Sequence, residues 1–139
     1  MDIISKSEKE TFDFGGKIAA GLKGGEILAL FGDLGAGKTT FAKGLANYLG
    51  VKKTIKSPTF NIVKTYPILH NKIKCLIHID AYRLNSSADA ESIGLAEMIS
   101  NQENVILIEW PENVWPVIEH KAQSLKFLFV DDNSRQINY

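Results

Sequence analysis

Residues 32–39 read GDLGAGKT, which matches the phosphate-binding pattern G-x-x-x-x-G-K-[ST]. This pattern constrains the fold because it requires a buried strand before it and a helix after it. Residues 26–31 form an almost continuous apolar run, which is typical of a strand buried on both faces. In residues 40–49, Phe41, Leu45 and Leu49 recur at helical spacing, and Gly50 provides a stop. The segment therefore predicts a strand, a phosphate-binding loop and a helix in succession.

The residue types within this loop suit phosphate chemistry. Gly35 and Gly37 allow a tight turn that brings backbone N–H groups close to phosphate oxygens. Lys38 supplies a positive charge for the β and γ phosphates, and the Thr39 hydroxyl is a Mg²⁺ ligand. We expect Lys38 to be catalytic as well as phosphate-binding. The expected nucleotide-binding residues of the loop are Gly32, Asp33, Leu34, Gly35, Ala36, Gly37, Lys38, Thr39 and Thr40.

Length and composition predict an ordinary globular protein. The chain has 139 residues, which favours a single domain over residues 1–139. Its 16 basic and 16 acidic residues cancel, which disfavours tight autonomous binding to nucleic acid. The single cysteine, Cys75, excludes an internal disulfide and fits a reducing compartment. The N-terminus lacks a signal-peptide core and no apolar run could span a bilayer, so we expect a cytoplasmic protein without a membrane partner.

Helix and strand patterns alternate along the chain. Ser7 and Glu10 form a capping box for a first helix that reaches about Leu22. The other expected elements are a β-hairpin within 60–80, a helix from Ser86 or Ser87 to about Ile99, a buried strand over 104–110, a short helical turn within 114–121, and a last strand over 125–130 followed by a polar tail. This order predicts the α/β class: a three-layer P-loop NTPase sandwich with a mainly parallel sheet, helices on both faces, and an antiparallel hairpin at one edge.

Two acidic residues follow apolar strands at their carboxyl ends, Asp80 and Glu109. Ligands of open α/β sheets bind at that edge, and a nucleotide-bound Mg²⁺ needs a carboxylate there. Both are therefore candidate metal ligands and candidate catalytic residues, and the sequence leaves open which one binds the metal and which orients water. The alternative for each is a carboxylate that caps the turn after its strand.

Three further candidate residues lie in these strands and loops. Thr59, in the loop after the P-loop helix, has a hydroxyl suited to sensing the γ-phosphate or Mg²⁺, or is an ordinary turn residue after Pro58. Arg83 is either a cis arginine near the phosphates or part of a surface ion pair. His78 shares a strand face with Asp80 and is expected to be a core or supporting residue.

Four motifs together resemble one family. They are residues 32–40, Ser-Pro-Thr-Phe at 57–60, His-Ile-Asp-Ala-Tyr-Arg-Leu at 78–84, and Glu-Trp-Pro-Glu at 109–112. In this order they resemble the TsaE (YjeE) family, small bacterial P-loop ATPases of tRNA threonylcarbamoyladenosine synthesis. The resemblance covers nearly the whole chain, and the combination is far more specific than any one motif.

The resemblance implies ATP and Mg²⁺ as cofactors and an ATPase that is weak alone. It implies TsaD and TsaB as protein partners, with tRNA reached only through their complex. By motif it implies phosphate and metal contacts from Lys38 and Thr39, the metal-binding acid at Glu109, a second acid at Asp80 and a switch-like loop at Thr59. It also implies that residues 8–11, including Thr11, approach the nucleotide base, with Glu112 a weaker candidate. The brief segment after Val130 departs from longer members.

Three other functional classes compete with this interpretation. A small-molecule or nucleoside kinase usually carries an arginine-rich lid, whereas this chain has only Arg83 and Arg135 and little length for a lid. A GTPase would need N-K-x-D, and the nearest segment, 71–74, lacks the aspartate. A non-catalytic nucleotide-binding scaffold would have no use for Asp80 and Glu109.

Overall fold

The computed structural model describes residues 1–56, 62–70 and 72–139. The described strands form one seven-stranded sheet in the order β1-β7-β6-β2-β5-β4-β3. Their bounds are β1 Asp2–Ser5, β2 Ile27–Phe31, β3 Val63–Pro67, β4 Cys75–Asp80, β5 Asn104–Glu109, β6 Ala122–Phe129 and β7 Arg135–Asn138. The helices are α1 Glu8–Ala20, α2 Lys38–Tyr48, α3 Ser87–Ser92, α4 Leu95–Ser100 and α5 Trp115–Ile118, and a 3₁₀ helix, η1, covers Pro111–Val114.

The centre of the sheet is parallel and both edges are antiparallel. β6, β2, β5 and β4 run parallel to one another, whereas β3 pairs antiparallel with β4. At the other edge, β7 pairs antiparallel with both β6 and β1. The expected α/β sandwich with a mainly parallel sheet is confirmed, including the antiparallel hairpin within 60–80. The second antiparallel edge, made by the two ends of the chain, was not predicted.

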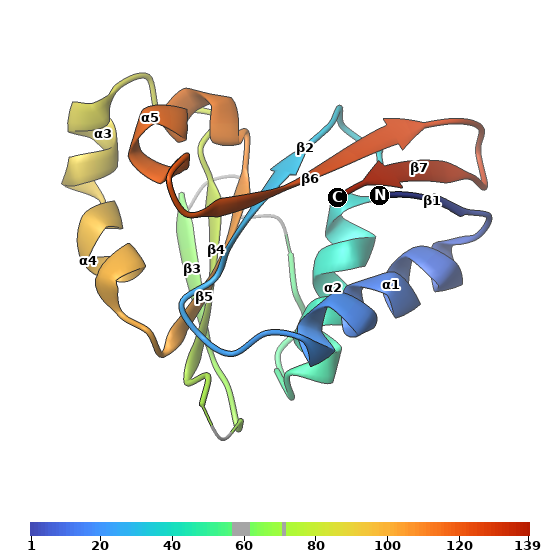
Figure 1. The fold of residues 1–139 in the computed structure, drawn as a ribbon, viewed down its shortest axis with the longest axis horizontal. Helices are drawn as coiled ribbons and strands as arrows, with labels where there is room; N and C mark the ends of the chain where they lie inside the picture. The colour runs from blue at the N-terminus through green and yellow to red at the C-terminus, as the bar shows by residue number, and fades with distance from the viewer. Residues whose placement is uncertain (57–61, 71) are drawn as a thin grey trace.

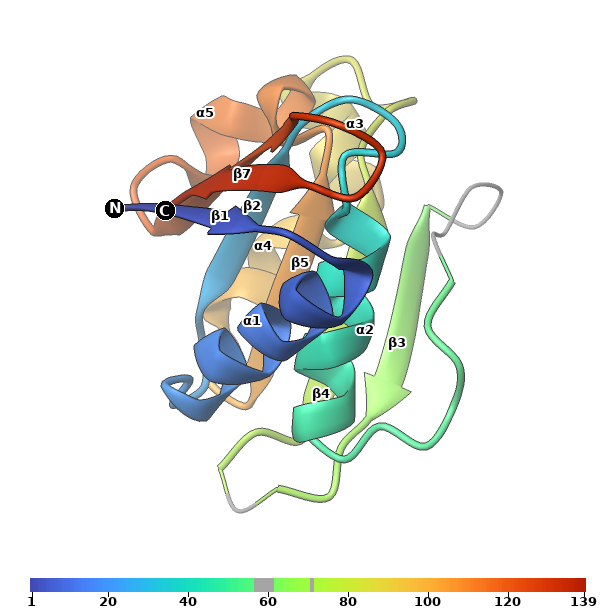
Figure 2. The same cartoon turned by 90° about the vertical axis from the view of Figure 1, so that its right-hand side faces the viewer.

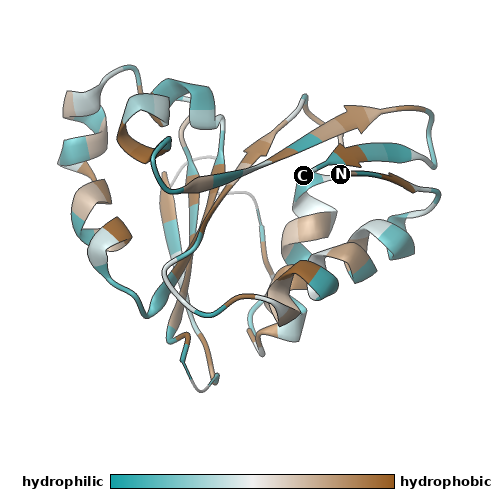
Figure 3. Cartoon of the chain, in the orientation of Figure 1, coloured by the Kyte–Doolittle hydropathy of each residue, from teal (hydrophilic) through white to brown (hydrophobic). Residues whose placement is uncertain are grey.

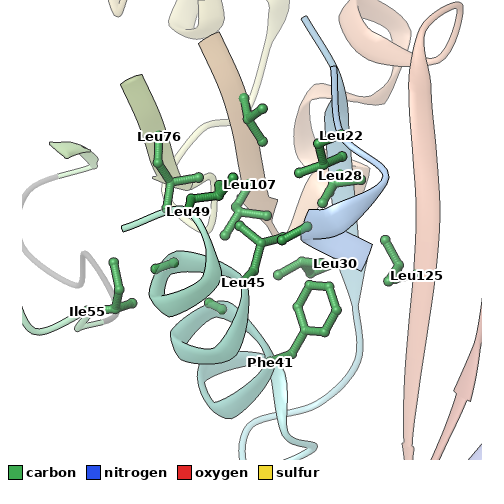
Figure 4. Packing of buried hydrophobic residues seen from close by; sticks show 14 of the residues in the cluster. Leu22, Leu28, Leu30, Phe41, Leu45, Leu49, Ile55, Leu76, Leu107 and Leu125 are labelled. Atoms are coloured by element: carbon green, nitrogen blue, oxygen red, sulfur yellow. The ribbon is translucent and has the colours of Figure 1, made fainter. Parts of the chain in front are cut away.

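The sheet is covered on both faces, as Figure 1 shows: α1 and α2 lie on one side, and α3, α4 and α5 on the other. Alternation along β2 explains this, because Leu28 and Leu30 pack with the α1–α2 layer whereas Ile27 and Ala29 pack with the opposite layer. Brown segments therefore concentrate in the central strands of Figure 3, while α1 alternates along its length. Figure 4 shows the Phe41 and Leu45 side chains of α2 beside Leu30 and Leu107 of the sheet.

α1 and α2 cross at very close range, which positions the start of α1 beside the P-loop. A Cβ atom added to Gly15 would lie 2.2 Å from the carbonyl oxygen of Phe41, and one added to Gly44 would lie 1.9 Å from that of Phe12. Only residues without a side chain allow the two backbones to approach this closely. Half of the predicted capping box is present: the Ser7 hydroxyl accepts a hydrogen bond from the Glu10 backbone N–H at 3.1 Å, whereas the Glu10 carboxylate accepts from the Lys6 backbone N–H at 2.7 Å and not from that of Ser7.

Two sequence-based boundaries were wrong. The helix expected to run to Ile99 is interrupted at Gly94, whose φ of 75° is left-handed and ends one helical segment before the next begins. The expected polar tail instead turns at residues 131–134 and returns as β7. In Figure 2 the N- and C-terminal strands β1 and β7 lie side by side, far from β3 at the opposite edge. Among the described residues, no helix is long and apolar enough to cross a membrane.

Candidate functional site

The predicted phosphate-binding loop connects the end of β2 to the start of α2. Gly32 has a φ of 139°, and a Cβ atom there would lie 2.5 Å from the Phe127 carbonyl oxygen, so glycine is required. Gly37 has a left-handed φ of 102° and occupies the N-cap of α2, where no side chain caps the helix. The first turn of α2 contains no acidic residue. Its N-terminal N–H groups are therefore arranged as in a helix that binds an anion.

Lys38 carries a positive charge into this loop. Its side chain is only 7% exposed, and its Nζ donates a hydrogen bond to the Gly32 carbonyl oxygen at 2.6 Å. The same Nζ lies 5.3 Å from the centroid of the Trp110 ring. Within the described residues the ammonium forms no salt bridge. A buried ammonium held by a carbonyl and a ring face is matched to an anionic ligand, because burying a charge without a counter-charge is costly.

Asp80 and Glu109 meet at the end of the parallel sheet, as predicted. They are paired in the β4–β5 register, and both line the cavity in front of the P-loop together with Thr39. Glu109 is 6% exposed, and its Oε2 lies 3.1 Å from Nε2 of His78. Asp80 is half-buried, and its Oδ1 accepts a hydrogen bond from the Tyr82 backbone N–H at 3.0 Å. Asp80 therefore caps the turn after β4 while it also faces the cavity.

The cavity has a volume of about 410 Å³, within the usual range for small-molecule and cofactor sites. Four parts of the chain form its walls: the start of α1, the P-loop with the first turn of α2, the ends of β4 and β5, and the connection between β6 and β7. Its described lining residues are Ser7, Glu8, Thr11, Leu34, Gly35, Gly37, Lys38, Thr39, Thr40, Asp80, Glu109, Trp110, Asp132, Asn133 and Arg135.

The outcome differs among the other residues predicted for the site. Thr11 lines the cavity and is 2% exposed. Its hydroxyl oxygen lies 2.7 Å from the hydroxyl oxygen of Ser5. Gly32, Asp33 and Ala36 do not line the cavity and instead shape the loop, since the Ala36 N–H donates to the Asp33 carbonyl oxygen at 3.1 Å. Thr59 lies outside the described residues.

The remaining candidates lie away from the cavity. Arg83 and Glu112 are both exposed, and neither belongs to the described residues that line it. The structure therefore does not bring Arg83 to the phosphate-binding loop.

Sequence reasoning missed the contribution of the β6–β7 connection. Arg135 donates to the Gly35 carbonyl oxygen from Nε at 3.2 Å and from Nη2 at 3.0 Å, which ties the C-terminal hairpin to the P-loop. Its guanidinium also lies 4.8 Å from the Phe129 ring centroid. The one local signal near β7 is the polar cluster over residues 131–134, which is typical of a turn, because residues 135–138 contain a single apolar residue, Ile137.

The loop before Arg135 is organised by Asp131. Its carboxylate accepts hydrogen bonds from the backbone N–H groups of Asn133 at 2.9 Å and Ser134 at 2.8 Å. These bonds, the Asn133 contact foremost, hold the pKa of the Asp131 carboxyl below its usual value. The charged carboxylate is therefore the form that orders the connection carrying Asp132 and Asn133 to the cavity.

Trp110 is partly buried against the hydrophobic core, and the structure also gives it a place in the site. It is the one non-glycine residue with positive φ among the described residues, at 55°, a conformation that costs roughly 1–2 kcal/mol. The ring lies at the cavity wall beside Lys38 and 5.1 Å from the centroid of the Tyr82 ring. A strained backbone thus holds an aromatic ring between the P-loop lysine and the surface.

The residues present fit a nucleotide phosphate chain with Mg²⁺. No cluster of three or more His, Cys, Asp or Glu side chains suited to a metal occurs in residues 1–56, 62–70 and 72–139. Mg²⁺ does not need such a cluster, because it is commonly held by one or two carboxylates, water and substrate phosphates. Thr39, Asp80 and Glu109 supply a hydroxyl and two carboxylates to the same cavity as Lys38.

Comparison with known proteins gives a consistent result. A family model described as "Threonylcarbamoyl adenosine biosynthesis protein TsaE" matches residues 5–137. Proteins named "tRNA threonylcarbamoyladenosine biosynthesis protein TsaE" are similar along most of their length. The one from Borreliella burgdorferi is 38% identical over 131 residues, 94% of this chain and 93% of its own. The one from Aquifex aeolicus is 38% identical over 138 residues, which cover 98% of this chain and 92% of its own. The crystal structure of Bacillus subtilis YdiB superposes with a TM-score of 0.75 at 31% identity, covering 99% of this chain and 82% of that one.

Proposed function

The chain belongs to the TsaE family of threonylcarbamoyladenosine biosynthesis, and from this premise we propose that it binds Mg·ATP in the described cavity and hydrolyses it. The observation that carries the proposal is the convergence of a buried P-loop lysine, Lys38, with Thr39, Asp80 and Glu109 on one cavity. A site that only bound a nucleotide would need no more than the anion-binding loop. Two carboxylates beside it supply what phosphoryl transfer to water also requires, a metal ligand and a group that orients the nucleophile.

Each residue has a distinct part in this proposal. Lys38 and the N–H groups at the start of α2 bind the β and γ phosphates. The Thr39 hydroxyl and the Glu109 carboxylate hold Mg²⁺, which supplies charge neutralisation at the transferring phosphoryl group. Asp80 orients the attacking water. By the family resemblance, Thr11 and its neighbours in α1 approach the base, and the Thr59 hydroxyl senses the γ-phosphate.

The remainder of the P-loop set acts through the backbone. Gly32 and Ala36 shape the loop, while Leu34, Gly35, Gly37 and Thr40 line the cavity and contact the nucleotide; Asp33 contributes its carbonyl to the loop.

The partners in this proposal are TsaD and TsaB, in the cytoplasm, with tRNA reached only through their complex. The family's place in tRNA threonylcarbamoyladenosine biosynthesis supports a role beside other proteins of that synthesis. Hydrolysis by the isolated chain is expected to be slow, and to rise when the partners are present.

The experiment measures phosphate release from Mg·ATP and ATP affinity by calorimetry, for the wild type and Lys38→Ala, with and without TsaD plus TsaB. Charge-assisted contacts contribute about 1.5–3 kcal/mol each, so losing one should weaken ATP binding roughly ten- to hundredfold. Lys43→Ala, at an exposed position of the same helix, is the matched control and should bind normally.

Three results would count against the proposal. They are unchanged ATP affinity in folded Lys38→Ala, transfer of phosphate to a small-molecule acceptor in place of water, and tighter binding of GTP than of ATP.

A further inference from the structure

His78 is a buried polar residue that the proposed chemistry does not yet use. It lies in β4, is 1% exposed, and shares the α1–α2 face of the sheet with Leu76, which is fully buried. Its cross-strand neighbour on β5 is Leu107, another fully buried member of the same cluster. Leucine at this position would continue the apolar face, whereas an imidazole must lose hydration to occupy it. The contact that compensates for this loss indicates what the imidazole does.

That contact is with Glu109. The Nε2 atom of His78 lies 3.1 Å from Oε2 of Glu109, in a pair where both side chains are almost completely buried. An ionised carboxylate can only accept hydrogen bonds, so the proton of this bond belongs to Nε2. The other ring nitrogen, Nδ1, is buried and has no hydrogen-bond partner among the described residues. A proton on Nδ1 would be a buried donor without an acceptor among the described residues, so the geometry favours the tautomer with its proton on Nε2.

We propose that His78 is a positioning residue that fixes the Glu109 carboxylate through its Nε2–H and so presents Glu109 to Mg²⁺. The inference rests on the proposed function in one respect, the assignment of Glu109 as a metal ligand. Glu109 lies at the end of its strand, and its side chain has three rotatable bonds that determine where the carboxylate points. The hydrogen bond from the buried ring stabilises the orientation in which Glu109 lines the cavity. Partners of this kind typically change metal affinity 10–100-fold when they are removed.

The test exploits the position of the donor nitrogen on the side chain. In His78→Gln the amide nitrogen occupies a place close to that of Nε2, whereas in His78→Asn it occupies a place close to that of Nδ1. We expect the wild type and His78→Gln to bind ATP more tightly with Mg²⁺ than in EDTA. His78→Asn should lose about tenfold of the Mg²⁺-dependent affinity while its affinity in EDTA is unchanged. His120→Asn, at an exposed position, is the control for replacing a histidine and should match the wild type.

A second measurement reads the tautomer without any ligand. In ¹⁵N NMR spectra of the imidazole groups, with the His70, His78 and His120 signals assigned from the variants, Nε2 of His78 should appear as an N–H nitrogen and Nδ1 as an unprotonated one. The opposite tautomer would overturn the proposal. Equal losses of Mg²⁺-dependent affinity in His78→Gln and His78→Asn, or no loss in either folded variant, would also overturn it. A wild type with equal ATP affinity in Mg²⁺ and EDTA would contradict the proposed function instead, and the NMR result would still decide the tautomer.

Discussion

Lys38 and Thr39 are neighbours at the start of α2, but they face different parts of the ligand in our proposal. Lys38 is buried and bonded to a P-loop carbonyl, whereas Thr39 is half-buried and shares the cavity wall with the two acids. We therefore expect their replacement to have separable effects on nucleotide and metal.

Thr39→Val should weaken Mg·ATP binding much more than ATP binding in EDTA. The substitution removes the hydroxyl that would ligate Mg²⁺ and keeps the branched shape of the side chain. Calorimetric titrations in both conditions measure the difference, and Thr54→Val, at an exposed position away from the cavity, provides the control. Equal losses in Mg²⁺ and in EDTA would show that Thr39 is not a metal ligand.

Substitutions of the two acidic residues, Glu109 and Asp80, should also have different effects. Glu109→Gln is expected to abolish the Mg²⁺ dependence of ATP binding, because it removes the charge of the carboxylate that His78 contacts. Asp80→Asn keeps an oxygen to accept the Tyr82 N–H and should retain Mg²⁺-dependent binding while phosphate release falls steeply. Titrations and phosphate-release assays on both variants are the measurement. The assignment is reversed if Asp80→Asn loses the Mg²⁺ dependence and Glu109→Gln keeps it.

At the residue scale, the sequence predicted those site residues whose spacing carries information. The P-loop pattern and the two strand-end acids follow from local order along the chain, and the parallel sheet then pairs Asp80 with Glu109. Arg135 could not be found this way, because 100 residues separate it from the carbonyl of Gly35 that it contacts. The same holds for the bond between His78 and Glu109, which depends on side-chain orientation across two strands.

At the scale of elements, α1 and α2 pack against each other at very close range. Gly15 and Gly44 permit this approach, because a Cβ atom added to either one would collide with the backbone of the other helix. This crossing keeps Thr11 beside the P-loop, since a Cβ on Gly37 would lie 3.5 Å from Thr11 Cγ2. The geometry of the candidate site therefore depends on a contact between the two helix backbones.

Gly44→Ala should destabilise the protein by about 2 kcal/mol. Its new methyl group would lie 1.9 Å from the Phe12 carbonyl oxygen, and overpacking of this kind costs roughly 1–3 kcal/mol. The matched control is Gly16→Ala in α1, where the nearest atoms are 3.9 Å away. There the gain in helix propensity should stabilise the fold by about 0.5–1 kcal/mol. Urea unfolding of both variants gives the two free energies, and shifts of the same sign and size would refute this account of the helix crossing.

Element existence was easier to predict than element ends. Buried parallel strands such as β2 and β5 are continuous apolar runs, so their pattern alone identifies them. The break at Gly94 and the short strands β1 and β7 depend on other information. Gly94 adopts a left-handed conformation that a helical pattern does not reveal, and β1 is a strand because β7 lies beside it. Pairing between the two ends of the chain leaves little local pattern in either.

At the scale of the whole molecule, the balanced net charge conceals a separation of charge. Residues 34–79 contain eight lysines and neither aspartate nor glutamate, so the acidic residues lie entirely in the rest of the chain. Lys52 and Lys53 follow α2, Lys72 and Lys74 lie between β3 and β4, and all four are exposed. The total of zero therefore does not mean an electrostatically uniform surface, and association with partners should depend on ionic strength.

Two aromatic rings connect the candidate site to the surface. Trp110 lies 5.3 Å from the Nζ atom of Lys38, and the Tyr82 ring packs on it at 5.1 Å while remaining 62% exposed. Two side-chain contacts, Lys38 with Trp110 and Trp110 with Tyr82, therefore link the proposed phosphate site to the molecular surface. For hydrolysis to control docking, ATP and ADP must differ in their preference for the docked state, because a ligand with equal preference shifts no equilibrium.

We therefore expect the affinity for TsaD–TsaB to differ among the states with an ATP analogue, with ADP and with no nucleotide. Tyr82→Ala should reduce that difference, because it removes the ring through which Trp110 reaches the surface. Tyr48→Ala, which removes another exposed tyrosine from the far end of α2, should leave it unchanged. Surface-immobilised binding assays on the three proteins in the three states give the affinities. If the wild type binds its partners equally in all states, coupling between hydrolysis and docking is refuted. If Tyr48→Ala and Tyr82→Ala behave alike, the aromatic pair is not the route.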